Sequence, residues 1–202
     1  MKPQGPVKLL VATRNAGKLR EFRRIMCGLP LEVVALDDLG LELSILENGA
    51  TFADNATIKA RAYARASGLP TMADDSGLEV DALGGRPGVH SARYAGEQAP
   101  DCERRALLLQ EMAAVPDAER TARFRCVLAL DWHGNLYRTE GSVEGVIARE
   151  ERGTGGFGYD PLFLVPELGR TLAELSPEEK NAISHRGKAA RAMRQVLMRL
   201  AR

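Results

Sequence analysis

The spacing of apolar positions along the chain predicts alternating strands and helices. Apolar runs predict strands at 7–12, 31–36, 69–73, 78–83 and 161–165, and apolar positions three or four residues apart predict helices at 18–26, 51–67, 101–115 and 187–200. Two alternating segments, 121–131 and 135–147, flank a turn at His133-Gly134-Asn135 and predict a β-hairpin. Ser176 and Glu179 predict a capping box at the start of a further helix. In a chain of 202 residues these elements predict one α/β domain, or one domain with two lobes.

The composition is ordinary for a soluble globular enzyme, with 45% hydrophobic and 27% charged residues. A formal net charge of +1 gives no bulk attraction to nucleic acid or membranes, and no apolar run approaches the roughly 20 residues of a membrane span. Residues 1–6 predict a flexible tail without the apolar stretch of a signal peptide, so we expect a cytoplasmic location. Cys27, Cys102 and Cys126 are widely spaced and are expected to be reduced thiols.

Two adjacent carboxylates, Asp74 and Asp75, follow the predicted strand at 69–73. Ligands of α/β proteins commonly bind at strand ends. Neighbouring like charges repel each other and lose hydration on burial, so they need water or a cation close by. Because apolar residues flank the pair on both sides, the motif favours a divalent-metal site. An acidic turn that caps the strand is the alternative interpretation.

A polar loop, Thr13-Arg14-Asn15-Ala16-Gly17-Lys18, joins the first strand to the first helix. Backbone amides at a helix start, together with a lysine, are typical of an anion-binding loop. The loop is not a Walker A motif, because the first glycine is missing and Leu19 replaces the Ser or Thr that holds magnesium. The alternative is an ordinary helix start with a solvated lysine.

The segment 153–161 matches G-x-G-x-x-G, but Pro161 and an apolar strand follow it where a dinucleotide-binding motif requires a helix. We therefore interpret the segment as a mobile loop in which Phe157 stacks on a base and Asp160 accepts a hydrogen bond from a ring N–H. The alternative, which the local residues favour, places Phe157 in the core and has the glycines make a turn.

A polar stretch, Lys180 to Arg186, lies between two inward-packing helices. Its hydroxyl, imidazole and guanidinium groups at Ser184, His185 and Arg186 are donors suited to a carbonyl such as purine O6. A solvated turn between the helices is the alternative. The chain has no recognisable Ser-His-Asp spacing and no H-E-x-x-H, so the sequence does not support a protein nucleophile.

Taken in order, the motifs resemble those of the inosine triphosphate pyrophosphatase family. Each is weak alone, but seven in order from about Val7 onward make chance implausible, and the departures are the short N-terminal tail and Asn48-Gly49-Ala50. The matching residues are Thr13 to Lys18; Glu47, Gly49, Thr51 and Phe52; Asn55, Ala56, Lys59 and Ala60; Ala73 to Leu78; Pro87, Gly88 and Ser91 to Tyr94; Gly155 to Pro161; and Glu179 to Asn181 with Ile183 to Arg186.

The resemblance implies an α/β fold with a long mixed central sheet flanked by helices, in which residues 7–202 form one two-lobed domain with the active-site cleft between the lobes. It implies a homodimer and Mg²⁺-dependent hydrolysis of the purine nucleoside triphosphates ITP, dITP and XTP to the monophosphate and pyrophosphate. It implies no nucleic-acid or membrane partner.

The resemblance also assigns roles to individual residues. Asp75 is the expected catalytic residue, and Glu47, Asp74 and Asp75 are the expected metal ligands. Asp75 is assigned to orienting the attacking water and accepting its proton, and Asp74 to ligating or positioning the metal. Which of the two contacts the metal is left open. The expected substrate-binding residues are Thr13, Arg14, Asn15, Ala16, Gly17, Lys18, Lys59, Ser76, Phe157, Gly158, Tyr159, Asp160, Lys180, Ser184, His185 and Arg186.

Three rival functions are less consistent with the residues. A pyrophosphatase for modified pyrimidine triphosphates, with a related fold, would lack the Ser184-His185-Arg186 group. A nucleotide sensor without hydrolysis would gain nothing from clustered carboxylates near phosphates. A nucleic-acid-binding protein is disfavoured by the balanced charge and by the lack of a basic patch with interleaved aromatic residues.

Overall fold

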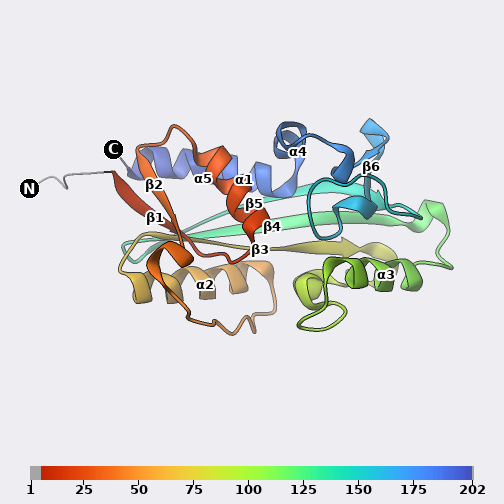
Figure 1. The fold of residues 1–202 in the computed structure, drawn as a ribbon, viewed down its shortest axis with the longest axis horizontal. Helices are drawn as coiled ribbons and strands as arrows, with labels where there is room; N and C mark the ends of the chain where they lie inside the picture. Colours follow the sequence, from red (N-terminus) through yellow and green to blue (C-terminus); the bar gives the residue numbers. More distant parts are fainter. Residues whose placement is uncertain (1–5, 202) are drawn as a thin grey trace, which may run out of the picture. The chain divides into compact units, whose positions relative to one another are not determined.

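A computed structural model describes residues 6–201 (Figure 1). Within this range the strands form a seven-stranded sheet in the order β2-β1-β3-β4-β5-β6-β7. β1 pairs in parallel with β2 and β3, whereas β6 pairs antiparallel with β5 and β7. The sheet is therefore mixed, and the predicted α/β class is confirmed. The strands are β1 (Val7–Val11), β2 (Leu31–Ala35), β3 (Thr71–Val80), β4 (Thr121–Trp132), β5 (Asn135–Ile147), β6 (Phe163–Val165) and β7 (Arg170–Thr171).

Three of the helices begin where a side chain accepts from one of the first backbone amides. Asn15 accepts from the Lys18 amide and Thr51 from the Asp54 amide. Ser176 and Glu179 form the predicted capping box. The helices are α1 (Ala16–Met26), α2 (Phe52–Ser67), α3 (Asp101–Glu111), α4 (Pro177–Ile183) and α5 (His185–Leu200).

β3 differs from the prediction in a way that matters for the acidic motif. Two strands, at 69–73 and 78–83, were expected on either side of the acidic motif, but β3 runs unbroken from Thr71 to Val80, so Asp74 and Asp75 lie inside a strand and the acidic-turn alternative is wrong. Basic side chains approach both carboxylates, Lys18 and Arg186 at Asp74 and Lys59 at Asp75. β1 ends at Val11, opposite Met72 of β3. The aspartates therefore lie just beyond the end of the neighbouring parallel strand, although not at the end of their own.

Other boundaries differ by a few residues. α1 begins at Ala16 and α5 at His185, each two residues before its predicted start, whereas α3 ends at Glu111. The predicted strand at 161–165 is shortened to β6, because residues 160–162 form a 3-10 turn. The predicted tail at residues 1–6 lies, except for Pro6, outside the described residues. No helix within residues 6–201 is both long enough and apolar enough to span a membrane.

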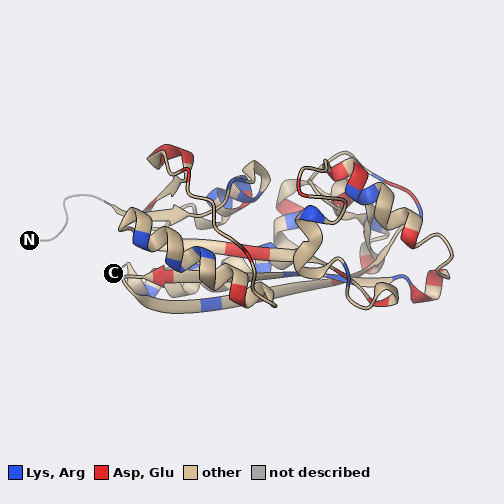
Figure 2. Cartoon of the chain, turned by 90° about the horizontal axis from the view of Figure 1, so that it is seen from below, with Lys and Arg blue, Asp and Glu red and all other residues tan. Residues whose placement is uncertain are grey.

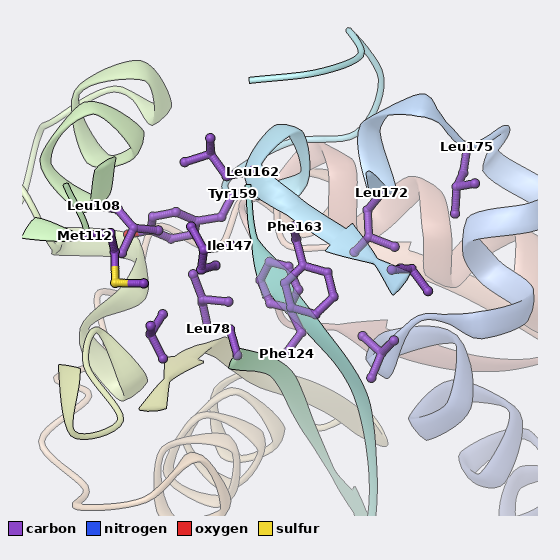
Figure 3. Close-up of a cluster of buried hydrophobic side chains, with 14 residues drawn as sticks. Leu78, Leu108, Met112, Phe124, Ile147, Tyr159, Leu162, Phe163, Leu172 and Leu175 are labelled. Carbon is purple, nitrogen blue, oxygen red and sulfur yellow. The ribbon is translucent and has the colours of Figure 1, made fainter. Parts of the chain in front are cut away.

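The chain divides into two compact units, each with its own hydrophobic core. The described part of unit 1 comprises residues 6–75, 126–141 and 186–201, and unit 2 comprises residues 76–125 and 142–185. In unit 1, α1 and α5 cover one face of the strands and α2 covers the other (Figure 1). The unit 1 core includes Leu9, Met72 and Leu128. In unit 2, Phe124 and Phe163 lie at the centre of the cluster drawn in Figure 3, with ring centroids 4.8 Å apart.

Candidate active site

Asp74 lies on the face of β3 that α1 and α5 cover. Lys18 Nζ lies 2.7 Å from Asp74 Oδ1, and Arg186 Nε lies 3.4 Å from Oδ2. The Cys126 thiol also approaches Oδ2, at 3.8 Å. Burial alone would raise the pKa of Asp74, but Lys18, Arg186 and Lys59 outweigh burial and hold that pKa well below its usual range. Asp74 is therefore a buried anion with a cation at each oxygen.

Asp75 points to the opposite face, because successive side chains of a strand alternate. There Lys59 of α2 lies between two carboxylates, with Nζ 2.9 Å from Glu47 Oε2 and 3.7 Å from Asp75 Oδ1. Burial raises the pKa of Asp75 despite the attraction of Lys59 and Lys18, and Asp74 adds to the increase. Within residues 6–201, Asp75 Oδ2 is one of four buried side-chain polar atoms without a hydrogen-bond partner.

The loop that carries Glu47 is attached to α2 next to Lys59. The Gly49 amide donates to Asn55 Oδ1 at 2.8 Å. A Cβ atom on residue 49 would lie 2.6 Å from Asp54 Cβ, so only glycine permits this close approach. The Glu47 carboxylate is thereby kept beside Lys59 and Asp75.

The Thr13–Lys18 loop is partly occupied by contacts within the protein. Asn15 Oδ1 caps α1, Thr13 Oγ1 accepts from the Asn15 amide, and Lys18 binds Asp74. Arg14 donates to the carbonyls of Leu41 and Leu43 at 3.3 and 3.4 Å. Thr13, Arg14, Asn15 and Ala16 are exposed or half-buried, whereas Gly17 is buried. The loop therefore has a defined shape and joins the acidic residues through Lys18.

Phe157 is anchored in unit 2 by a buried ion pair. Lys180 Nζ lies 2.7 Å from Asp160 Oδ2 and 4.6 Å from the centroid of the Phe157 ring. The same Asp160 oxygen accepts from the Phe157 amide at 2.8 Å. Phe157 is half-buried, and Tyr159 is the aromatic residue that enters the core, donating to the Ser91 carbonyl at 3.0 Å. The alternative that placed Phe157 in the core is wrong.

The predicted donors Ser184, His185 and Arg186 are all buried, so the solvated-turn alternative is also wrong. His185 stacks on Phe124, with ring centroids 4.7 Å apart and 9° between the planes. Arg186 Nη1 pairs with Glu21 Oε2 at 2.7 Å, and its Nε contacts Asp74. Ser76 is half-buried in β3, directly after Asp75.

Comparisons with known proteins match almost the whole chain. The sequence profile of the Ham1 family matches residues 9–196. The chain belongs to the Ham1 family. It is 53% identical over 191 residues to a dITP/XTP pyrophosphatase of Geobacter sulfurreducens, covering 94% of this chain and 96% of the relative. It is 50% identical over 193 residues to the dITP/XTP pyrophosphatase of Escherichia coli, covering 94% of this chain and 98% of the relative.

Solved structures agree with this family membership. A HAM1 protein from Coxiella burnetii superposes with a TM-score of 0.88 at 44% identity, covering 96% of this chain and 99% of that one. A nucleoside-triphosphatase / dITP/XTP pyrophosphatase from Mycobacterium abscessus gives a TM-score of 0.75 at 46% identity, covering 93% and 98%. The predicted fold class and family resemblance are confirmed.

The Ham1-family chain does not bring the three predicted metal ligands together as one set. Among residues 6–201 no three His, Cys, Asp or Glu side chains gather as a metal site. Both oxygens of Asp74 face cations, which does not suit a metal ligand. Glu47 and Asp75, whose buried Oδ2 has no hydrogen-bond partner, do suit Mg²⁺, because this ion commonly binds one or two protein carboxylates and completes its shell with water and phosphate.

Several residues of this Ham1-family site were not predicted. Glu21 holds Arg186 from a position 165 residues away in the sequence, and Asp101 and Arg105 contact Gly158 from α3. Glu21 and Arg105 carry no local signal, because a charged residue on an amphipathic helix is usually solvated. The Asp101 position, in the first turn of a helix, indicates only a favourable interaction with the helix dipole.

Proposed function

We propose that this Ham1-family chain hydrolyses non-canonical purine nucleoside triphosphates (ITP, dITP and XTP) to the nucleoside monophosphate and pyrophosphate. The observation that carries the proposal is Lys59 between Glu47 and Asp75, on a chain about 50% identical to curated dITP/XTP pyrophosphatases. In such a group the lysine can bind phosphate, and the neighbouring carboxylates can bind a divalent metal.

The triphosphate binds to the Thr13–Lys18 loop. The backbone of Ala16 and Gly17 at the start of α1 offers N–H groups to phosphate oxygens, and Lys18 and Lys59 supply positive charge. Lys18 is held in place by Asp74, which also holds Arg186. Asp74 is thus proposed to position the cations rather than to bind the metal.

Asp75 acts on the attacking water. It orients the water toward the α-phosphorus and accepts its proton as the new P–O bond forms, while the α–β bridging oxygen leaves with pyrophosphate. Glu47 and Asp75 would hold Mg²⁺, which when bound offsets the charge of the phosphate oxygens and of the leaving pyrophosphate. Ser76, the next residue in the sequence after Asp75, contacts the substrate.

The base binds to residues of unit 2 and the start of α5. Phe157 stacks on the ring, supported by the backbone of Gly158 and Tyr159, and Asp160, Lys180, Ser184, His185 and Arg186 face its polar edge. Donors directed at O6 can hydrogen-bond to hypoxanthine and xanthine, which carry a carbonyl there. Adenine carries an amino group at the same position and leaves a buried donor unpaired. Such a loss costs about 1–3 kcal/mol, which corresponds to roughly tenfold or more in discrimination per contact.

One assay tests this proposal. Pyrophosphate release is measured with Mg²⁺ for ITP, XTP, GTP, ATP and dTTP under identical conditions. We expect release from ITP and XTP, and much less from ATP, which lacks O6, and from dTTP, which is not a purine nucleotide. GTP also carries O6, so low release from GTP would show that the site rejects its 2-amino group. Equal release from dTTP would favour the pyrimidine-directed alternative, and no release from any substrate would favour a sensor. Omission of Mg²⁺, with added chelator, should abolish the release.

A homodimer and a single two-lobed domain are proposals that follow from the family resemblance, and a cytoplasmic location is a proposal that follows from the sequence composition. The charge distribution supports a nucleotide enzyme that binds neither nucleic acid nor membranes, because acidic and basic residues are interspersed along the chain in Figure 2. Sedimentation equilibrium measures the oligomeric state directly, and a monomeric mass across the working concentration range would contradict the homodimer.

A further inference from the structure

Two side chains of α3 hold both polar backbone groups of Gly158. Asp101 Oδ2 accepts from the Gly158 amide at 2.6 Å, and Arg105 Nη1 donates to the Gly158 carbonyl at 3.0 Å. Residues four apart on a helix lie on the same face, so one face of α3 supplies both contacts. We call Asp101 and Arg105 the α3 clamp.

The α3 clamp also connects the two ends of the glycine-rich segment. Arg105 Nε pairs with Glu151 Oε1 at 2.9 Å, and its Nη1 reaches Gly158. Glycine-rich backbone loses more conformational entropy on ordering than other sequences do. A single guanidinium at both ends of such a segment limits the conformations that it can adopt. The other oxygen of Asp101 is bound by Arg104, so the clamp carboxylate is itself held.

The glycine segment packs against fixed backbone on its other side. The Gly155 amide donates to the Ala173 carbonyl at 3.0 Å. A Cβ on Gly153 would lie 2.5 Å from the Ala173 carbonyl carbon. Asp160 accepts from the Phe157 amide, and the Asp160 amide donates to the Phe157 carbonyl at 3.2 Å. The backbone on both sides of Phe157 is therefore anchored, and the half-buried ring lies 4.6 Å from Lys180 Nζ.

We propose that Asp101 and Arg105 are positioning residues that hold the Phe157 ring ready for the purine base before the nucleotide binds. The proposal rests on the role of Phe157 given under the proposed function. Ordering a loop during binding weakens affinity, so a loop that is ordered beforehand lowers KM. The α3 clamp acts through Gly158 and touches neither substrate nor the carboxylates around Lys59, so its effect is expected in KM and not in kcat.

The first experiment compares Asp101→Ala and Arg105→Met with the wild-type enzyme on ITP. We expect KM to rise about five- to tenfold while kcat stays within about twofold. Asp101→Asn keeps a hydrogen-bond acceptor and should restore most of the wild-type KM. Glu103→Ala is the matched control, because Glu103 is an exposed acidic residue on the same helix. A purely structural role would instead lower the melting temperature and the active fraction and leave KM unchanged.

A second readout follows the loop itself without substrate. Hydrogen–deuterium exchange of the peptide covering residues 153–160 should be faster in Asp101→Ala and Arg105→Met than in the wild type and in Glu103→Ala. Unchanged exchange in both clamp variants would overturn the proposal. If Asp101→Ala folds poorly, Arg105→Met carries the same comparison, because methionine replaces the aliphatic part of the arginine side chain and removes only the guanidinium.

A double-mutant cycle with Phe157→Ala separates this inference from the proposed function. If the α3 clamp acts through the ring, Asp101→Ala adds no further rise in KM in the Phe157→Ala background. If Phe157→Ala raises KM and the clamp variants do not, the clamp is wrong and the base-stacking role stands. If Phe157→Ala leaves KM unchanged, base stacking itself is wrong. If the two increases multiply, Asp101 acts elsewhere and the clamp is again wrong.

Discussion

Asp74 and Asp75 are neighbours in the sequence but face opposite sides of the strand that carries them. Asp74 contacts Lys18 and Arg186, whereas Asp75 contacts Lys59. Each carboxylate thus has its nearest cation on a different face of the sheet, but the pKa of Asp74 is lowered whereas burial and Asp74 raise the pKa of Asp75. The two residues are therefore expected to respond differently to substitution.

Asp75→Asn should reduce turnover about 10²- to 10⁴-fold, because an amide cannot accept the proton of the attacking water. Pyrophosphate release measures turnover, and equilibrium binding of ITP should remain detectable. Asp117→Asn is the control, because Asp117 is exposed and pairs with Arg149. Turnover near the wild-type rate in Asp75→Asn would remove Asp75 from the catalytic role.

Lys18→Ala should raise KM for ITP about tenfold or more, since charge-assisted hydrogen bonds to phosphate are lost together with the contact that fixes Asp74. Steady-state kinetics over a range of ITP concentrations measures the change. Lys8→Ala, at an exposed position of β1, should leave KM unaltered. An unchanged KM in Lys18→Ala would mean that the loop does not hold phosphate.

Lys180→Met should destabilise the protein by about 3–5 kcal/mol, because it removes the cation from the buried Asp160 carboxylate. Urea denaturation followed by circular dichroism measures the free energy of unfolding. Asp160→Asn combined with Lys180→Met should lose less stability than the sum of the two single variants. Strict additivity would show that the two side chains are not coupled.

Gly156→Ala and Gly158→Ala form a matched pair within one loop. Both glycines have positive φ, at +72° and +62°, so each substitution should cost about 1 kcal/mol in backbone strain. A Cβ on residue 156 would also overlap the Asp160 carboxylate, whereas a Cβ on residue 158 meets no atom of the described chain within 4 Å. Gly156→Ala should therefore unfold at clearly lower urea concentration, and equal midpoints would contradict the packing of the loop on Asp160.

The stability contributed by Asp101 should depend on pH. Burial alone would raise its pKa, but the Gly158 amide and Arg104 outweigh burial and lower the pKa below the ordinary 3.8. Because the folded-state pKa is lower than the unfolded one, this stability is present above the unfolded pKa and is lost as the pH falls through the folded pKa. Urea denaturation at several values between pH 7 and 3 should show the advantage of wild type over Asp101→Asn shrinking toward acid, and a constant difference would contradict this.

Local pattern predicted much of the fold. The apolar runs at residues 7–12 and 31–36 became β1 and β2, and the hairpin appeared around His133 and Gly134. β3 was missed because its polar centre contains two carboxylates, which a local pattern assigns to a turn. Only the cations from α1, α2 and α5 make a continuous buried strand possible there.

The sequence predicted those site residues that belong to motifs shared, in order, with a family. It missed the residues whose place in the site depends on tertiary contacts. The order of motifs pointed to the family that the profile match confirms. The sequence did not indicate that Asp74 binds two cations, because Arg186 lies 112 residues away from it. The contacts of Asp101 and Arg105 with Gly158 span more than 50 residues and follow from how α3 packs within unit 2.

The two units are interleaved along the chain. Unit 1 is assembled from three separate stretches of sequence and unit 2 from two, and β3, β4 and β5 pass from one unit to the other. Truncating the chain at any one position would therefore not yield either unit with all of its segments. We expect truncation at any of these crossings to abolish both units together, so that recombination among related genes exchanges the entire fold or nothing.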